Sequence, residues 1–435
     1  MKQVGFIYQG NSSKNRIDYV LDFINTHPLN GRVELKSQDI LEETIYYGLD
    51  TSETDWFIPR QQIIFSDRKY SSHELKSNCY LHKADKVYSV EGESKTDQIF
   101  LKSRRFQFDL LEAIFFHISR YEEYGIVQLN EWDALKESEH FLVRNQLEKT
   151  PVVDHLIISF VNAITNQETK KTTFTISHDI DYVRKFSSPL DKLKKGLGFI
   201  KRGEWLALKN YRNQLKVFKE TQKDPYDVFE EILKKESINK EIYYLVGGNH
   251  TFDPPIDLSD PIFKKSINLA KDRGYQIGIH PSYLSWTSTT LARNEKKVLE
   301  EEIQQQVFIS RQHYLHFSFP KTILVLEELG IRKDSSIGFN RRIGFRCGTG
   351  FPYTLYVLGE ERRSELIEQP LIYMDSSIIK ESKKKKELIL KSTVSFIEEN
   401  KYNTHITFNF HNSRFEESDL NDLGLREIYQ SLFEV

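Results

Sequence analysis

Two aspartates at the end of one predicted strand are the residues of this chain best placed for chemistry. The segment Thr173 to Asp181 alternates its side chains as a strand does, so Asp179 and Asp181 leave the same face. Two carboxylates held this close raise one another's pKa, or they need a cation between them. The pattern therefore indicates a functional site. The alternative is a strand that simply ends in a polar turn.

Histidines follow other predicted strands in the second half of the chain. From residue 224 onward strands alternate with helices, which is typical of βα units in a parallel sheet or barrel. Active sites of such folds lie beyond the carboxyl ends of the strands. The predicted strand ends carry His280, then His313 with His316, and finally His411. We therefore expect these side chains to meet the two aspartates at one edge.

Carboxylate and imidazole groups together are the ligands of zinc and similar divalent ions. Such an ion polarises a carbonyl and generates a hydroxide-like water near neutral pH. One aspartate can bind the ion while the other takes the proton of the water, and His411 can protonate a leaving amine. The residues thus predict a metal-dependent hydrolase that acts on an amide or an ester.

The elements that position these residues fall into two regions. Residues 1–165 mix short strands with helices and predict a smaller α+β accessory domain, in which we find no catalytic constellation. The polar stretch Asn166 to Lys171 is typical of a linker. For residues 172–435 the alternation of strands and helices predicts an irregular (β/α) barrel of the α/β class.

A basic helical insertion interrupts the second region at about residues 187–223. Between residues 192 and 223 it holds ten Lys or Arg residues against Glu204 and Glu220, with apolar residues such as Trp205 between them. One interpretation is an amphipathic arm that makes peripheral contact with anionic membrane lipids or with a phosphorylated lipid carrier of glycans. The other is a pair of helices that packs on its own protein and has a solvated face.

Composition excludes several classes of protein. The 435 residues include 61 basic and 63 acidic ones, so the net charge of −2 gives no general attraction for nucleic acid. Apolar runs are far shorter than a membrane span, and no signal-peptide core follows Met1. Cys79 and Cys347 are too few for a disulfide framework. We expect a cytoplasmic protein of unknown oligomeric state.

Several segments of the chain resemble the polysaccharide deacetylases, which share the NodB-homology domain. The first, second and last motifs of that family are matched by Thr175 to Asp181, Tyr275 to His280 and Phe408 to His411. Within the superfamily the chain is most similar to two-domain bacterial proteins with an uncharacterised N-terminal domain, which also carry the motifs at Ser119 to Tyr124, Gly278 to Tyr283, Arg311 to Leu315 and Gly344 to Arg346. The resemblance covers about residues 172–413 and implies a barrel of the glycoside hydrolase/deacetylase type.

The resemblance also implies roles for individual residues. It makes Asp179 the catalytic base and His411 the general acid. It makes Asp181 and His280 ligands of a divalent metal, with Zn²⁺ as the expected ion. The implied reaction is the removal of acetyl groups from an N-acetylated sugar or a surface-polysaccharide precursor.

Two positions depart from the family pattern. Leu284 stands where the family has a second histidine, so the third ligand is open between His313, which we favour, water and His178. His316 stands where relatives often carry the arginine that orients the base, so this role is missing or falls to Arg346. Two other functions therefore stay open: a glycan-binding or scaffold protein with a degenerate barrel, and a metal-free amidohydrolase.

Overall fold

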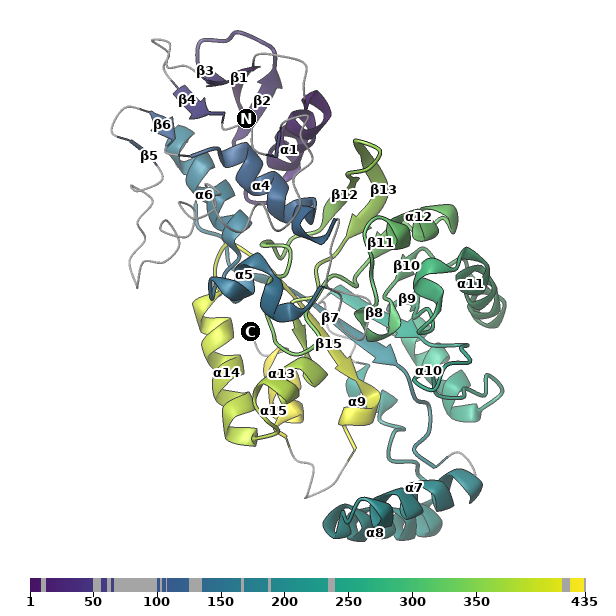
Figure 1. Cartoon of the computed structure of the whole chain (residues 1–435). Coiled ribbons are helices and arrows are strands. Elements are labelled where there is room, and N and C mark those ends of the chain that lie inside the picture. Colours follow the sequence, from purple (N-terminus) through teal and green to yellow (C-terminus); the bar gives the residue numbers. More distant parts are fainter. Residues whose placement is uncertain are drawn as a thin grey trace.

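Two sheets organise the computed structural model of the chain (Figure 1). The structure describes residues 1–8, 13–49, 56–60, 64–65, 100–101, 104–106, 108–124, 135–165, 168–186, 189–233, 239–416 and 423–433. Cys79, residues 166–167 of the linker and residues 187–188 of the insertion lie outside this part of the chain.

Among the described residues, the first sheet has six strands in the order β2-β1-β3-β4-β6-β5. Its strands are β1 (Lys2–Tyr8), β2 (Val33–Ser37), β3 (Thr44–Gly48), β4 (Trp56–Pro59), β5 (Phe100–Leu101) and β6 (Arg105–Phe106). The α-helices among the described residues of this region are α1 (Lys14–Thr26), α4 (Leu110–Ile118), α5 (Phe141–Arg144) and α6 (Val152–Ile164). All pairs except β5 with β6 are parallel, and α1 connects β1 to β2 as a βαβ unit. This corrects the α+β arrangement expected for residues 1–165.

The second sheet has nine strands in the order β12-β13-β11-β10-β9-β8-β7-β15-β14. They are β7 (Thr173–Ile180), β8 (Asn239–Tyr244), β9 (Gln276–Ile279), β10 (Ile309–Ser310), β11 (Lys333–Asp334), β12 (Tyr353–Val357), β13 (Arg362–Glu368), β14 (Tyr373–Met374) and β15 (His405–His411). Only β12 and β13 pair antiparallel among these described strands. The α/β class is confirmed, whereas no ladder between described strands closes the sheet into a barrel.

Helices lie beside the second sheet and between its strands in the sequence, except that the first two in chain order stand away from the sheet (Figure 1). They are α7 (Pro189–Lys201), α8 (Trp205–Thr221), α9 (Phe229–Ile232), α10 (Pro261–Asp272), α11 (Thr289–Ile303), α12 (Lys321–Glu328), α13 (Asp375–Glu381), α14 (Lys386–Glu399) and α15 (Leu425–Ser431). Local signals set the start of α10: Asp260 caps the helix by accepting from the N–H of Ile262 at 2.8 Å, and Pro261 stands at its first position. None of the described helices is both long and apolar enough to cross a bilayer.

One predicted strand is wrong. The strand predicted to carry His313 and His316 is absent, because His313–Leu315 form a 3₁₀ turn after the short strand β10. Tyr314 and Leu315 have φ angles of 60° and 53°, which belong to the left-handed region and not to a strand.

The pairing of β7 with β15 determines which polar side chains are neighbours on one face of the sheet. Asp179 lies beside His411 and Ser177 beside Asn409 in a parallel register. Asp179, Ser177 and Asn409 are buried on one face, where His411 is partly buried, while apolar residues such as Ile176 and Phe408 are buried on the other. The predicted alternation is therefore observed, and it delivers Asp179, Asp181 and His411 to one end of the sheet.

A buried ionic cluster joins the two regions through the Ser119–Tyr124 motif. Arg120 is fully buried, and its guanidinium donates to Glu122 at 2.9 Å and to Glu123 at 2.8 Å. It also donates to the backbone carbonyl of Arg346. The guanidinium of Arg346 forms an ion pair with Glu123. The motif thus docks the first region onto the loop before β12.

Candidate metal and catalytic site

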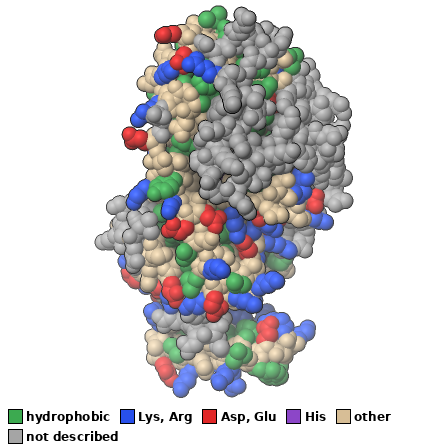
Figure 2. Space-filling model, turned by 90° about the vertical axis from the view of Figure 1, so that its left-hand side faces the viewer, with side chains coloured by type: hydrophobic (Ala, Val, Ile, Leu, Met, Phe, Trp, Pro, Cys, Tyr) green, Lys and Arg blue, Asp and Glu red, His purple; other side chains and the backbone are tan. Residues whose placement is uncertain are grey.

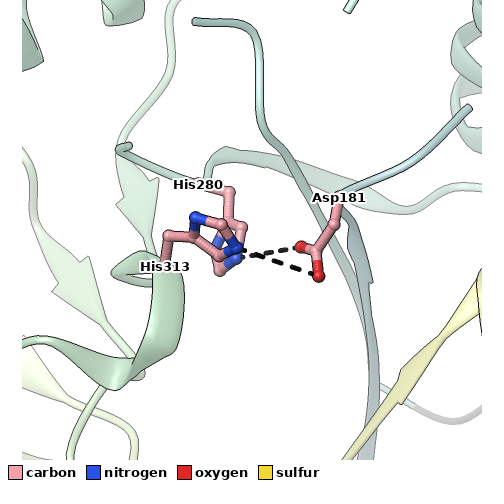
Figure 3. A group of neighbouring side chains, drawn as sticks. All are labelled: Asp181, His280 and His313. Carbon is pink, nitrogen blue, oxygen red and sulfur yellow. Dashed lines mark ion pairs between the residues drawn. The ribbon is translucent and has the colours of Figure 1, made fainter. Parts of the chain in front are cut away.

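Asp181, His280 and His313 meet at the carboxyl ends of β7, β9 and β10 (Figure 3). Nε2 of His280 lies 3.3 Å from Oδ1 of Asp181, and Nε2 of His313 lies 4.0 Å from Oδ2 of Asp181. One ligand atom from each residue lies within 4.8 Å of the others. The structure therefore brings Asp181, which follows the first predicted strand, together with His280 and His313, two of the predicted histidines.

These three side chains fit a divalent cation. Zinc bonded to nitrogen and oxygen at about 2.0 Å in a tetrahedron separates neighbouring ligand atoms by about 3.3 Å. The separations of 3.3 Å and 4.0 Å from Asp181 to the two histidines need only small side-chain adjustments to reach this value. Two imidazoles and a carboxylate leave room for substrate or water as further ligands, as in catalytic zinc sites.

The other ring nitrogens of both histidines are held by neighbours. Nδ1–H of His280 donates to the carbonyl of Arg311 at 2.6 Å, and Nδ1–H of His313 donates to Oδ1 of Asp253 at 2.9 Å. Asp253 is itself fixed, because it also accepts from the backbone N–H of Tyr283 at 2.9 Å. This arrangement directs both Nε2 atoms to the centre of the site and selects the tautomer that a metal needs.

Replacement of Asp253 tests this support. We expect Asp253→Asn to weaken zinc affinity by about 10- to 100-fold. The substitution removes the carboxylate that orients His313, while Nε2 of His313 remains available to the ion. Competition titration with a chromogenic zinc chelator measures the effect. Asp257→Asn is the matched control, because Asp257 is an exposed aspartate of the same loop that bonds Ser259. Equal affinities for the two variants would contradict the orienting role of Asp253.

Asp179 lies beside these three side chains, and both of its carboxylate oxygens accept hydrogen bonds. Its Oδ1 accepts from Nη1 of Arg311 at 2.9 Å, and its Oδ2 accepts from Nδ2 of Asn409 at 2.7 Å. Burial alone would raise the pKa of Asp179, but Arg311, His280 and His411 outweigh it and hold the pKa below its usual value. The carboxylate is therefore charged at neutral pH.

Arg311, and not Arg346, holds Asp179. The guanidinium of Arg311 is fully buried, donates to Ser177 at 2.8 Å as well as to Asp179, and lies over the ring of Tyr243 at 4.3 Å. Arg346 instead donates to the carbonyl of Gly338 at 3.0 Å and pairs with Glu123 in the cluster between the two regions. The expectation that Arg346 orients the base is thus corrected, since its side chain is engaged elsewhere.

His411 completes the site from β15. Its Nδ1–H donates to Oδ1 of Asp375 at 2.7 Å, and its Nε2 lies 3.7 Å from Asp181 and 3.9 Å from Asp179. Burial alone would lower the pKa of His411, but Asp375 and Asp181 outweigh it and raise the pKa to about 9. In this setting the imidazole is protonated at neutral pH and presents an N–H toward the other site residues.

Three other positions singled out in the sequence lie away from the ligands. His178 is on the opposite face of β7, where its Nε2 lies 3.2 Å from the hydroxyl of Tyr429, so it is not an alternative third ligand. His316 stacks on Trp286 with ring centroids 4.4 Å apart. Leu284 is 48% exposed. Of the alternatives from the chain itself, the structure therefore places only His313 beside Asp181 and His280.

Four supporting residues were missed or given no role from sequence: Asp253, Arg311, Asp375 and Asn409. Three of them could have been found from the rule that active sites lie beyond the carboxyl ends of the strands. Asp253 lies in the loop after β8, Arg311 directly follows β10 and Asp375 directly follows β14. Their distances along the chain carry no sign that they contact Asp179, His313 or His411. The three-dimensional pairing of the strands was needed for that.

The site opens into a cavity of about 310 Å³. Asp179, Asp181, His280, His313 and His411 line its floor together with polar groups of the neighbouring loops. The aromatic side chains that line it and remain partly exposed are Tyr182, Phe252 and Tyr314. The cavity therefore combines a charged floor with aromatic walls, as small-molecule sites do.

Comparison with known proteins identifies a relative for the first region of the chain. A search of curated proteins finds no match to the chain. A model of a family of unknown function, DUF7033, matches residues 6–169. The matched segment holds the first sheet and ends shortly before β7, so the residues of the candidate site lie outside it. Residues 6–169 are thus similar to the DUF7033 family, whose function is unknown.

Proposed function

We propose that the protein is a divalent-metal-dependent deacetylase that removes the acetyl group from an N-acetylated sugar or a precursor of a surface polysaccharide. The observation that carries the proposal is the position of Nε2 of His411, which lies 3.9 Å from Asp179 and 3.7 Å from Asp181, beside the group that Asp181 forms with His280 and His313. A carboxylate base, an imidazolium acid and a cation site at one cavity are the groups that amide hydrolysis requires.

The chain's own residues supply two proton transfers. The carboxylate of Asp179 accepts a proton from water as the water oxygen bonds to the acetyl carbon. Nε2–H of His411 then donates its proton to the nitrogen as the carbon–nitrogen bond breaks, so the products are acetate and a free amine. Asp181, His280 and His313 would hold the divalent cation, which supplies Lewis-acid activation of water and carbonyl when bound.

A sugar is the substrate class that the cavity walls favour. Partly exposed rings of Tyr182, Phe252 and Tyr314 offer flat apolar surfaces on which the C–H face of a pyranose can pack. Polar groups such as the side chains of Gln312 and Asn340 also line the cavity and can bond hydroxyls. We include in this proposal the barrel of the polysaccharide deacetylase type, because Arg311, which follows β10, donates to Asp179 of β7 and to Asn409 of β15 although other strands lie between them in the sheet.

Acetate release from a panel of N-acetylated amino sugars and their oligomers tests the proposal. We expect release by the purified full-length chain, its loss after dialysis against a chelator, and its recovery on addition of Zn²⁺. Release that survives the chelator but is lost in Asp179→Asn would select the metal-free amidohydrolase. Saturable glycan binding without release, in a protein that takes up no metal, would select the glycan-binding or scaffold protein.

A further inference from the structure

The helical hairpin of α7 and α8 stands at the end of the molecule remote from the first sheet (Figure 1). Within α8, only Tyr211 and Gln214 are buried. Tyr211 contacts Phe186 with ring centroids 5.7 Å apart, and Phe186 contacts Phe218 at 5.2 Å. These rings fasten the base of the hairpin to the chain that leaves β7, while most of its surface remains exposed.

An apolar groove runs between the two helices. Leu193, Leu197 and Ile200 of α7 line it at helical spacing, together with Leu208 and Leu215 of α8, and its volume is about 380 Å³. Leu193 is 59% exposed and Leu197 is 54% exposed. Isolated exposed leucines are common, but a stripe shared by two helices marks an interaction surface.

Basic side chains surround this groove. Residues 192–223 hold ten Lys or Arg against Glu204 and Glu220, a net charge of +8 in a chain whose net charge is −2. Lys192 and Arg212 line the groove itself. Figure 2 shows Lys and Arg side chains next to hydrophobic ones on the lobe at the lower end, where the hairpin lies. The partner of this surface must therefore offer negative charge and apolar groups together.

We propose that the α7–α8 hairpin binds peripherally to a membrane that contains anionic lipids. Headgroup phosphates would meet the basic residues while Leu193, Leu197 and Trp205, which is 66% exposed, enter the acyl boundary. A second copy of this chain is a poor occupant, because two surfaces of net charge +8 repel one another. The proposal does not depend on the reaction at the metal site.

Sedimentation of the full-length chain with vesicles tests this proposal. We expect it to bind vesicles of phosphatidylcholine mixed with phosphatidylglycerol, to bind phosphatidylcholine alone far less, and to be released by high salt. Lys194→Gln, Lys209→Gln and Lys216→Gln together should lower the partition coefficient by about 100-fold. Leu193→Ser with Leu197→Ser should also release the protein, because the apolar contact is lost.

A matched triple variant controls for total charge. Lys171→Gln, Lys297→Gln and Lys391→Gln remove the same charge from exposed positions outside the hairpin, and this variant should bind as the wild type does. Absence of binding to the anionic vesicles, or equal loss of binding in both triple variants, would overturn the proposal. So would a dimer that forms without vesicles and dissociates on the leucine substitutions, which would assign the groove to a second copy.

Discussion

Asp179→Asn is expected to lower the rate of acetate release by about 10²- to 10⁴-fold, the range for loss of a positioned general base. An amide at this position cannot take a proton from water. Its NH₂ group would also face Nδ2 of Asn409, where the carboxylate now accepts a bond of 2.7 Å. The three ligands stay in place, so metal content should not change. Single-turnover assays of the metal-loaded variant measure the effect.

Asp334→Asn is the matched control for that experiment. Asp334 is also a fully buried carboxylate of the same sheet, but it accepts from Ser310 at 2.5 Å and is not among the residues that line the cavity. Burial raises the pKa of Asp334 to about 6. Its substitution should leave turnover within a few-fold of the wild type. Full turnover in Asp179→Asn would show that another group is the base.

Arg311→Met is expected to lower the free energy of unfolding by about 3–5 kcal/mol, because it leaves the buried carboxylate of Asp179 without its cationic partner. The guanidinium also donates to Ser177 at 2.8 Å, to Asn409 at 2.9 Å and to the carbonyl of Ser335 at 2.9 Å, and methionine replaces none of these bonds. Urea unfolding followed by circular dichroism measures the change.

Arg293→Met makes the same substitution in an exposed ion pair. Arg293 contacts Glu328 at 2.6 Å on the surface of α11, and the loss of such a pair changes stability by about 0–1 kcal/mol. Comparison of the two variants separates the effect of burying the ion pair from the effect of replacing arginine by methionine. If the two substitutions lowered the free energy of unfolding by similar amounts, the buried pair of Arg311 with Asp179 would contribute no more to stability than an exposed pair does.

Much of the candidate site follows from patterns that are local in the sequence. The alternation in β7 and β15 places Asp179, Asp181 and His411 on one face, since a strand has a period of two residues. The order of strands and helices predicts a parallel sheet, and parallel strands bring His280 and His313 to the same end. These inferences need no knowledge of distant contacts.

The remaining features depend on contacts between distant segments. Arg311 and Arg346 both sit in motifs of the right composition, and only packing decides that Arg311 reaches Asp179 while Arg346 pairs with Glu123. The parallel pairing of β1 with β2 and β3 could not be predicted from short strands alone, because parallel and antiparallel strands of this length share the same pattern. The left-handed backbone conformation of Tyr314 could not be predicted either, because no glycine stands at this position.

Metal content of the purified full-length chain tests the central claim most directly. After loading with Zn²⁺ and gel filtration, elemental analysis should find one ion per chain in the wild type and in Asp179→Asn. It should find little in His280→Ala or Asp181→Ala, because each removes one ligand atom of the triad. Absence of stoichiometric metal from the wild type, or equal metal in the two ligand variants, would contradict the assignment of Asp181, His280 and His313 as a metal centre.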